Sequence, residues 1–330
     1  MIAALYHINQ CALYKVGSKA KLAQILGISV ASLLAIVKKP RYREFLLPEE
    51  VCPFTGKITK ERWVQEPLGE LRAIHERLRK LLMRVSPPAY AHAAVKGRSY
   101  RTNAEAHMTS KMVATFDITK FYPSTSDSAV FSFFCKGLCC PGDIAAMLAT
   151  LVCYPPRSSD GKLGLPTGSP LSPVLSVYAN KTLFDALEKI ALANGLKFTC
   201  YVDDLTFSGD SLPGGLKDIV ASAIRRYGHK MAEKKTRIFN ASQAKHVTGV
   251  VLAGNTLVVP YGRFKKARRI ESVLNAEADS ALRLKLIQKL AGLLGEAAFL
   301  DPRYQAWARS SYGLLAEARL IETKKNKLHS

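Results

Sequence analysis

The chain has 330 residues, which is enough for a hydrophobic core and two or three subdomains. It carries 48 Lys and Arg residues against 26 Asp and Glu, a formal net charge of +22 that is typical of nucleic-acid-binding proteins. No apolar stretch approaches the ~20 residues of a membrane-spanning helix, and the first residues lack the features of a signal peptide. The seven cysteines have no zinc-binding spacing, so we expect reduced thiols in a cytoplasmic protein without a membrane partner.

Residues 1–45 are expected to form an N-terminal helical segment. Apolar residues recur at helical spacing over 21–28 and 31–37, in an outline similar to a helix-turn-helix. Packing against the region that follows is favoured over DNA reading for these helices. A strongly amphipathic helix is predicted over 68–85, because six apolar residues share one face: Leu68, Leu71, Ile74, Leu78, Leu81 and Leu82.

Residues 112–116 have the pattern of a buried strand, and Asp117 follows directly. An acid at the end of an apolar strand, before a turn that Pro123 stops, is well placed to bind a metal ion. Tyr122 stands at the same corner, where an aromatic ring beneath a nucleotide sugar would clash with a ribose 2′-OH. The alternative role for Tyr122 is that of a core aromatic residue.

Pro and Gly residues are dense between 164 and 173, which predicts a loop, and an apolar helix is expected over 174–187. A glycine-rich loop at a helix N-terminus presents backbone N–H groups and the positive end of the helix dipole. Such a loop suits a base-paired nucleotide or its phosphates.

Two adjacent acids, Asp203 and Asp204, lie between short segments rich in aromatic and β-branched residues, which predicts a β-hairpin with both carboxylates at its turn. Adjacent carboxylates repel each other, and a divalent cation removes the repulsion. Mg²⁺ binds a few protein carboxylates together with substrate phosphates. Nucleotide polymerisation uses two such ions roughly 4 Å apart, so we interpret the acids as metal ligands. The alternative is a solvated turn.

Residues 259–330 are predicted to be helical and basic, with an amphipathic helix over 281–294. Aromatic side chains in this region are candidates for stacking on RNA bases, although at least half of them are expected in the core. These are Tyr261, Phe264, Tyr304 and Trp307. Five cations lie within seven residues near the start of the region: Arg263, Lys265, Lys266, Arg268 and Arg269.

The Asp117 strand, the LPTGSPLSP loop and the YVDD hairpin, in that order, resemble the polymerase core of reverse transcriptases. Two further motifs are similar to signatures of bacterial retron reverse transcriptases. The run from Asn103 to His107 matches NAxxH, and Val247-Thr248-Gly249 matches VTG. The resemblance extends from about residue 20 to about residue 315.

The resemblance implies an α+β right-hand polymerase fold. Residues 46–258 would form the fingers and the palm, a short antiparallel sheet backed by helices, and residues 259–330 a helical, RNA-binding thumb. It also implies an RNA-directed DNA polymerase that uses two Mg²⁺ ions, with Mn²⁺ as an alternative, and dNTPs. Such enzymes copy a cognate structured non-coding RNA, primed from an RNA 2′-OH, into a branched RNA–DNA hybrid (msDNA). They resemble parts of anti-phage defence systems that include an effector or toxin protein.

The family's site residues transfer by motif position. Asp117, Asp203 and Asp204 match the catalytic, metal-binding acids, and Tyr122 matches the sugar gate. Contacts to the dNTP are implied for Thr167, Gly168, Lys235 and Arg98; the alternatives are an exposed lysine for Lys235 and a phosphate-backbone contact for Arg98. Contacts to primer or RNA are implied for Asn103, His107, Val247, Thr248, Gly249, Arg263, Lys265, Lys266, Arg268 and Arg269, and His107 has a structural contact as its alternative.

The chain departs from the family pattern in three places. It has YVDD where YADD is usual, Thr167 where the loop usually has glutamine, and Val177 where asparagine is common. None of these changes removes a metal ligand, so we expect an active enzyme. Two other hypotheses stay open: a defence-type reverse transcriptase that needs no template or copies a different RNA, and a catalytically silent RNA-binding scaffold that restrains a toxin.

Overall fold

The computed structural model describes residues 5–154 and 163–328, which fall into two compact units. Unit 1 contains the described residues of 1–48 and 61–243, and unit 2 contains 49–60 and those of 244–330. The two compact units divide the residues differently from the three predicted domains. The functional assignment of those domains stays a prediction.

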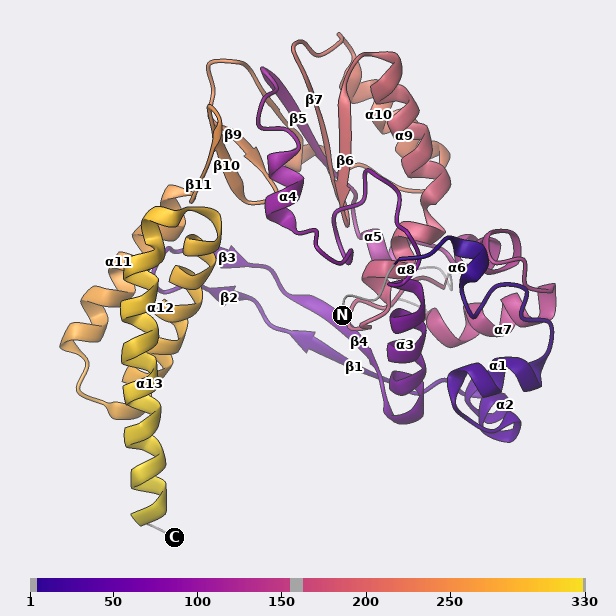
Figure 1. The fold of residues 1–330 in the computed structure, drawn as a ribbon, viewed down its shortest axis with the longest axis horizontal. Coiled ribbons are helices and arrows are strands. Elements are labelled where there is room, and N and C mark those ends of the chain that lie inside the picture. The colour runs from indigo at the N-terminus through magenta and orange to yellow at the C-terminus, as the bar shows by residue number, and fades with distance from the viewer. Residues whose placement is uncertain (1–4, 155–162, 329–330) are drawn as a thin grey trace. The chain divides into compact units, whose positions relative to one another are not determined.

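Unit 1 contains a four-stranded antiparallel sheet, whose strands β5, β6 and β7 are seen in the upper part of Figure 1. Its order is β6-β7-β5-β8, so the two middle strands are β7 and β5. These strands are rich in β-branched and aromatic residues, and the Phe116 and Phe207 rings meet edge to face at 5.7 Å. The strands are β5 (Met112–Asp117), β6 (Lys197–Tyr201), β7 (Asp204–Gly209) and β8 (Arg237–Phe239).

Apolar helices pack against this sheet. Phe184 and Leu187 of α9 (Lys181–Ala193) and Val220 of α10 (Leu216–Arg226) share a buried cluster with Phe207. The helix predicted over 174–187 is in fact two helices, α8 (Ser172–Ala179) and α9, because Asn180 leaves helical geometry between them. The predicted short antiparallel sheet backed by helices is thus confirmed.

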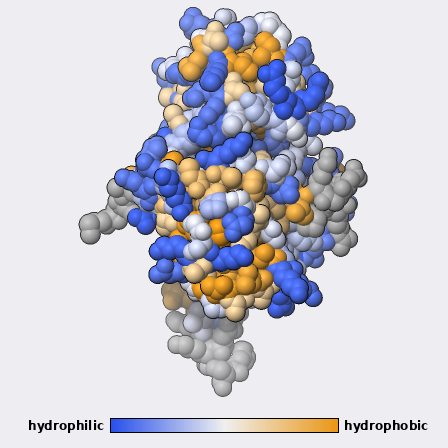
Figure 2. Space-filling model, turned by 90° about the vertical axis from the view of Figure 1, so that its right-hand side faces the viewer, coloured by the Kyte–Doolittle hydropathy of each residue, from blue (hydrophilic) through white to orange (hydrophobic). Residues whose placement is uncertain are grey.

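A second core cluster in unit 1 joins helices from its N-terminal part. The predicted amphipathic helix is α3 (Gly69–Leu82), which buries Leu71, Ile74, Leu78, Leu81 and Leu82. It packs with α1 (Lys19–Leu26), α2 (Val30–Lys38), α6 (Asp127–Ser132), the π-helix η2 (Phe133–Gly137) and α7 (Gly142–Val152). Hydrophilic and apolar surface alternate over the face of the molecule seen in Figure 2.

In the part of the chain that the structure describes, no single helix is both long and apolar enough to cross a membrane. The pair α1 and α2 passes that test only when taken together, by length and composition, and it is bent by 93°. Leu22 of α1 and Leu33 of α2 are fully buried in the core of unit 1. All seven cysteines lie among the described residues, and none forms a disulfide.

Unit 1 also contains a two-stranded ribbon of β1 (Tyr42–Leu47) and β4 (Arg62–Pro67), which pair antiparallel with Tyr42 opposite Pro67. Two short helices complete the elements that matter for the site. They are α4 (Tyr100–Glu105), whose N-terminus Ser99 caps with a capping box, and α5 (Phe121–Ser124).

Unit 2 combines two small antiparallel sheets with helices, which confirms the predicted helical C-terminal region. Phe54 packs against its helical core, with Lys289 Nζ 5.3 Å from the ring centroid, and Arg269 donates a hydrogen bond to the Phe54 carbonyl oxygen. The elements are β2 (Glu50–Val51), β3 (Ile58–Thr59), β9 (Lys245–Val247), β10 (Val250–Ala253), β11 (Thr256–Val258), α11 (Tyr261–Ala276), α12 (Ser280–Leu300), η4 (Pro302–Tyr304) and α13 (Gln305–Leu328).

Candidate active site

The register of the central sheet brings the three predicted acids together. Asp117 is the last residue of β5 and stands opposite Asp204, the first residue of β7. Asp203 lies in the turn that joins β6 to β7, and its carbonyl oxygen accepts a hydrogen bond from the Ile118 N–H at 3.1 Å. All three carboxylates therefore belong to one end of the sheet.

The turn before Asp203 has an unusual backbone. Tyr201 pairs with Asp204, so Val202 and Asp203 form a two-residue hairpin loop. Such loops favour positive φ at their first residue, usually supplied by glycine. Here Val202 has φ +61°, which is costly for a β-branched residue, by about 1–3 kcal/mol. The YVDD sequence thus stores backbone strain beside the acids.

The acids form a site with excess negative charge. Burial, and then the charge of Asp117, raises the pKa of Asp203. Burial, together with the charges of Asp203 and Asp117, raises the pKa of Asp204 to about 6. The Lys235 ammonium supplies one compensating charge at 2.7 Å from Oδ2 of Asp117, and this hydrogen bond raises the pKa of Lys235.

An oxygen-only donor set with raised carboxylate pKa values fits a hard divalent cation such as Mg²⁺. Within the described residues, however, no three His, Cys, Asp or Glu side chains lie close enough together to bind a metal ion as they stand. The Ala232 N–H donates a 2.7 Å hydrogen bond to the Asp117 carbonyl oxygen, which holds the segment of Lys235 next to this acid. The local arrangement thus balances Asp117 by an ion pair with Lys235.

A pocket of about 550 Å³ adjoins the acids. Asp117, Asp203 and Lys235 line one part of it, and Tyr122 and Thr167 line another. The Tyr122 ring also packs against both core clusters of unit 1, and burial raises the pKa of its hydroxyl. Tyr122 is therefore a packed aromatic residue that also lines the pocket, and its role as a sugar gate stays a prediction.

Strand β4 contributes residues to the pocket that the sequence did not indicate, namely Trp63 and Gln65. The Gly168 N–H donates to the Gln65 carbonyl oxygen at 3.0 Å, and a Cβ atom on Gly168 would lie only 2.7 Å from that oxygen. The Gln65 side-chain oxygen accepts hydrogen bonds from the backbone and hydroxyl of Thr167. A glycine at 168 thus allows the loop to lie directly on β4.

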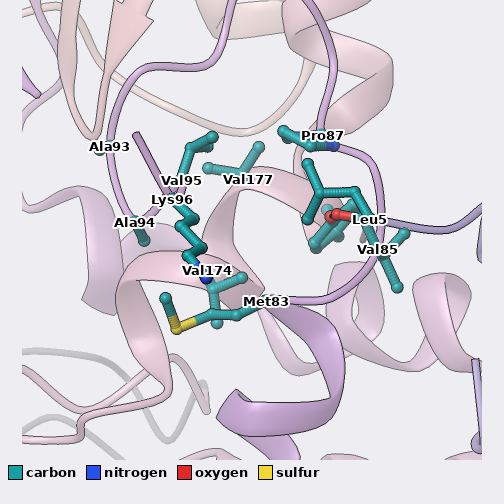
Figure 3. Close-up of a pocket in the computed structure, with 11 residues that line it drawn as sticks. Leu5, Met83, Val85, Pro87, Ala93, Ala94, Val95, Lys96, Val174 and Val177 are labelled. Carbon is teal, nitrogen blue, oxygen red and sulfur yellow. The ribbon is translucent and has the colours of Figure 1, made fainter. Parts of the chain in front are cut away.

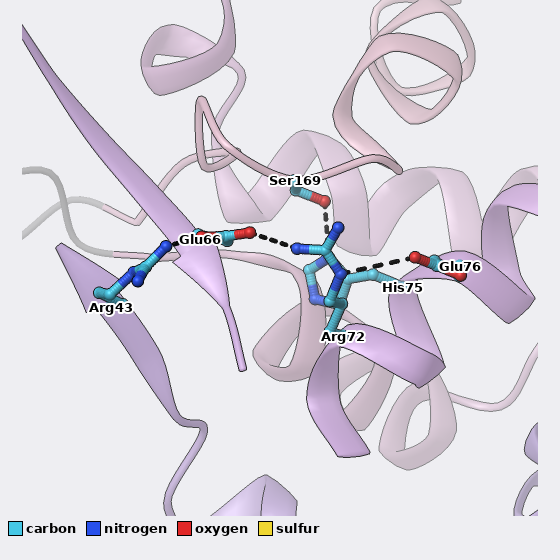
Figure 4. Close-up of polar contacts among 6 residues, drawn as sticks. All are labelled: Arg43, Glu66, Arg72, His75, Glu76 and Ser169. Atoms are coloured by element: carbon cyan, nitrogen blue, oxygen red, sulfur yellow. Dashed lines mark hydrogen bonds and ion pairs between the residues drawn. The ribbon is translucent and has the colours of Figure 1, made fainter. Parts of the chain in front are cut away.

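A buried histidine, His75, also holds the loop that contains Thr167, Gly168 and Ser169. His75 of α3 is fully buried, and burial lowers its pKa to about 4, so the ring is neutral. Its Nε2 lies 2.9 Å from the Leu151 carbonyl oxygen, and its Nδ1 lies 2.6 Å from the Ser169 hydroxyl. Figure 4 shows Ser169 facing His75, and next to them Glu66 between Arg43 and Arg72.

A buried polar network beneath Tyr122 was also missed by sequence reasoning. His229 Nε2 lies 2.8 Å from the side-chain oxygen of Asn180, and His229 Nδ1 lies 2.8 Å from the Ser124 hydroxyl. The Asn180 amide donates to the Thr125 hydroxyl at 2.9 Å. The break between α8 and α9 therefore places Asn180 where it can fix the helix that contains Tyr122.

Val177 of α8, the departure from the family pattern noted above, is almost completely buried. It lines a small, mostly apolar pocket with Leu5, Met83 and Val85 (Figure 3). An asparagine would place an amide in these surroundings, so valine is the better match for this packing.

Arg98 is held by backbone carbonyl groups. Its Nη1 donates to the carbonyl oxygens of Pro88, Ala89 and Ala91 at 3.2, 2.8 and 2.6 Å. The guanidinium is thus held by the chain between α3 and α4. These contacts give Arg98 a structural role, and its contact with the dNTP stays a prediction.

The two residues of the NAxxH motif that are predicted to contact RNA lie in the interior of unit 1, and their RNA contacts stay a prediction. Asn103 and His107 are both fully buried. His107 Nδ1 lies 2.6 Å from the Ser208 hydroxyl and its Nε2 lies 2.7 Å from the Thr199 hydroxyl. Burial lowers the pKa of His107 to about 3. The structural alternative predicted for His107 describes this geometry: the side chain joins the segment after α4 to β6 and β7.

The VTG motif forms a turn. Val247 is fully buried at the end of β9 and pairs with Val250 of β10, and its contact with the primer stays a prediction. Thr248 and Gly249 both have positive φ, 46° and 77°, as a two-residue hairpin loop of this type requires. A side chain at Gly249 would also come within 3.1 Å of Arg263 Nη2. At this turn Thr248 is half-buried and Gly249 is exposed.

The basic cluster divides into two groups. Arg263 pairs with Glu296 at 2.7 Å, Arg268 pairs with Glu271 at 3.1 Å, and Arg269 donates to the Phe54 carbonyl oxygen, so these three help to hold unit 2 together. Lys265 and Lys266 form no ion pair with any residue that the structure describes. These two lysines are therefore the clearest candidates for phosphate contacts.

Comparison with known proteins identifies the class of molecule. Residues 70–252 match the family described as "Reverse transcriptase (RNA-dependent DNA polymerase)". The chain belongs to this family, and its enzyme class is RNA-directed DNA polymerase.

Its relatives narrow the type, because the chain is similar to retron reverse transcriptases. It is 27% identical to the Retron Ec86 reverse transcriptase of Escherichia coli over 246 residues, which cover 74% of this chain and 73% of that protein. It is 29% identical to the Retron Mx65 reverse transcriptase of Myxococcus xanthus over 302 residues, or 85% and 67% of the two chains. For the Retron Se72 reverse transcriptase of Salmonella heidelberg the identity is 29%, and the chain spans 62% of that relative.

A solved structure of the foamy viral protease-reverse transcriptase in complex with double-stranded DNA is also similar. The likeness covers 78% of this chain and 37% of the viral chain, at 18% identity and a TM-score of 0.43.

Proposed function

We propose that this protein is a retron-type RNA-directed DNA polymerase. The observation that carries the proposal is the register that places Asp117 opposite Asp204, with Asp203 in the adjoining turn, next to a pocket of about 550 Å³. Its cognate template would be a structured non-coding RNA, copied from an RNA 2′-OH into a branched RNA–DNA hybrid. The NAxxH and VTG motifs and the similarity to named retron enzymes support this type.

Asp117, Asp203 and Asp204 would hold two Mg²⁺ ions, or Mn²⁺ in their place. When bound, such ions lower the pKa of the attacking hydroxyl and neutralise charge on the phosphates. The primer hydroxyl would lose its proton to solvent and form a bond to the α-phosphorus of the dNTP, the bond from the α-phosphorus to the oxygen that bridges to the β-phosphorus would break, and pyrophosphate would leave. Most of the acceleration would come from positioning and charge neutralisation.

Two side chains and one loop would position the dNTP. The Lys235 side chain is 66% exposed, so its ammonium can turn from Asp117 toward the triphosphate. The Tyr122 ring, held by the two cores, would lie beneath the sugar and exclude a ribose 2′-OH. Thr167 and Gly168 would contact the nucleotide through the loop's surface, since the Thr167 hydroxyl is already bonded within the protein.

The RNA and its RNA–DNA product would bind to exposed groups in unit 2. Lys265 and Lys266 on α11, together with the Thr248-Gly249 turn, are proposed as contacts, with Arg263, Arg268 and Arg269 adding positive charge. We further propose that the protein acts in the cytoplasm, in an anti-phage defence system with an effector or toxin protein from the same locus.

The test is DNA synthesis by the full chain with its co-purified RNA. Asp203→Asn is expected to abolish incorporation of labelled dNTP, because a metal ligand is lost, while RNA binding survives. The matched control is Asp210→Asn, since the Asp210 side chain is 82% exposed and lies outside the pocket. Synthesis by Asp203→Asn at the wild-type rate would overturn the assignment.

A further inference from the structure

Unit 2 contains an open groove of about 480 Å³ that the proposed polymerase chemistry does not use. Val251 of β10 and Val258 of β11 form apolar parts of its lining, and Tyr261, Phe264 and Tyr304 add aromatic rings. Tyr261 is the first residue of α11 and is 73% exposed. A large aromatic side chain that stays this exposed beside an apolar groove marks a binding surface.

The aromatic rings behind Tyr261 are held in place. Phe264 lies 6.3 Å from Tyr261 and 6.1 Å from Trp307, and the Trp307 ring stacks on Tyr304 at 6.3 Å with 19° between the planes. The indole N–H of Trp307 donates to Glu271 at 3.0 Å, and Arg268 lies over the indole at 4.7 Å. The rings of Phe264, Trp307 and Tyr304 thus form a preorganised platform behind Tyr261. A ligand that stacks there loses little binding free energy to the ordering of side chains.

Two cations of α11, Lys265 and Arg268, lie near these aromatic rings in the chain or in space. Lys265 is exposed on the same helix as Tyr261 and has no ion-pair partner among the described residues. Glu271, the acid close to the rings, is already engaged by Arg268 and Trp307. An apolar aromatic surface with an unpaired lysine on the same helix is complementary to a nucleotide, whose base stacks while its phosphate contacts the charge.

We propose that this groove binds an unpaired nucleobase of single-stranded RNA, with Tyr261 as the stacking residue. The inference rests on the proposed function, in which RNA is the partner of unit 2. Bases inside an RNA duplex are already stacked on their neighbours, so the groove selects loops, bulges and ends. It would thereby fix one unpaired position of a structured RNA, while the lysines of α11 contact phosphates independently of sequence.

The test measures binding of the full chain to oligouridylate, to oligoadenylate and to an RNA duplex of equal length, by fluorescence anisotropy. Tyr261→Ala is expected to weaken binding to the single strands by roughly 5- to 100-fold, and Tyr261→Trp to retain it. Binding to the duplex should change less than about twofold, and the salt dependence should stay the same because no charge is removed. Tyr227→Ala is the control, since Tyr227 is 40% exposed in unit 1.

Equal losses for single strand and duplex, or unchanged binding by Tyr261→Ala, would overturn the inference. The melting temperature of each variant shows whether it is folded, and an exposed side chain such as Tyr261 can be shortened without disturbing the core. Incorporation of dNTP by the wild-type chain is measured separately. Its absence would contradict the proposed polymerase, whereas unchanged RNA binding in an active Tyr261→Ala enzyme would contradict only the groove.

Discussion

The Thr167 hydroxyl lies 3.2 Å from the side-chain oxygen of Gln65 and 3.1 Å from the carbonyl oxygen of Trp63. A hydroxyl has one hydrogen to donate, and both neighbours are acceptors. The Thr167 hydroxyl therefore donates its hydrogen bond within the protein. Gln65 is 5% exposed and comes from strand β4, 102 residues away. The loop that usually contains glutamine thus has threonine here, and a glutamine from another strand lies against it.

We predict that Gln65→Met, which keeps the size but removes the acceptor, raises the KM for dNTP about fivefold with little change in kcat. Thr167→Val should have a similar effect, because it removes the other side of the same contact. Steady-state kinetics of the double variant should show no further loss. Additive losses would mean that the two residues act separately.

From the backbone strain at Val202 we predict how two substitutions at this position affect stability. Alanine is normally better than glycine at an ordinary position by about 0.5–1 kcal/mol, but only glycine adopts positive φ without cost. With φ at +61°, Val202→Gly is therefore expected to be at least as stable as Val202→Ala. Urea unfolding of both variants measures the difference, and a clear advantage for alanine would show that the turn is unstrained.

His107 allows the buried role to be separated from RNA binding. His107→Ala leaves the Ser208 and Thr199 hydroxyls without a buried partner and opens a cavity, so it should cost about 2–4 kcal/mol of unfolding free energy. Binding of RNA per folded molecule should stay within about twofold, since a buried ring leaves no surface contact to lose. Weaker RNA binding at unchanged stability would support the RNA contact predicted for His107.

Local patterns were sufficient to predict part of this site. The apolar strand before Asp117 and the hairpin around Asp203 are local signals, and the sheet register confirms that they meet. Contacts between distant segments carry no such signal, which is why Gln65, 102 residues from Thr167, was missed. In the sequence His107 resembles a surface residue. Its hydrogen-bond partners, the Thr199 and Ser208 hydroxyls, lie 92 and 101 residues away, so no local pattern indicates that it is buried.

The two groups of cations should respond differently to charge removal. Lys265→Gln and Lys266→Gln are expected to weaken RNA binding and to reduce the log–log salt slope by about 0.9 for each lost duplex phosphate contact, at unchanged stability. Arg268→Gln and Arg269→Gln should also destabilise unit 2, because Arg268 pairs with Glu271 and Arg269 with the Phe54 carbonyl. Salt titrations and thermal melts separate the two effects. An unchanged slope in the lysine variants would place the RNA elsewhere.

The raised pKa of Asp204 predicts how Mg²⁺ stabilises the protein. Because the folded-state pKa is about 6 against an ordinary 3.8, this carboxyl favours the folded state fully below about pH 4, and the contribution is lost as pH rises through about 6. Mg²⁺ binds the ionised form, so it should raise the melting temperature more at about pH 7.5 than at about pH 5. Asp204→Asn should remove most of that difference, and an equal Mg²⁺ effect at both pH values would contradict the assignment.

The central claim is that this enzyme copies one structured RNA into DNA from a 2′-OH. It is tested most directly by purifying the protein from cells that carry its native locus and sequencing the attached nucleic acid after treatment with RNase, DNase or debranching enzyme. A short DNA of unique sequence, joined 2′–5′ to a structured RNA, is the predicted result. Unbranched or homopolymeric DNA, or RNA alone, would contradict the claim and favour a different defence polymerase or a silent scaffold.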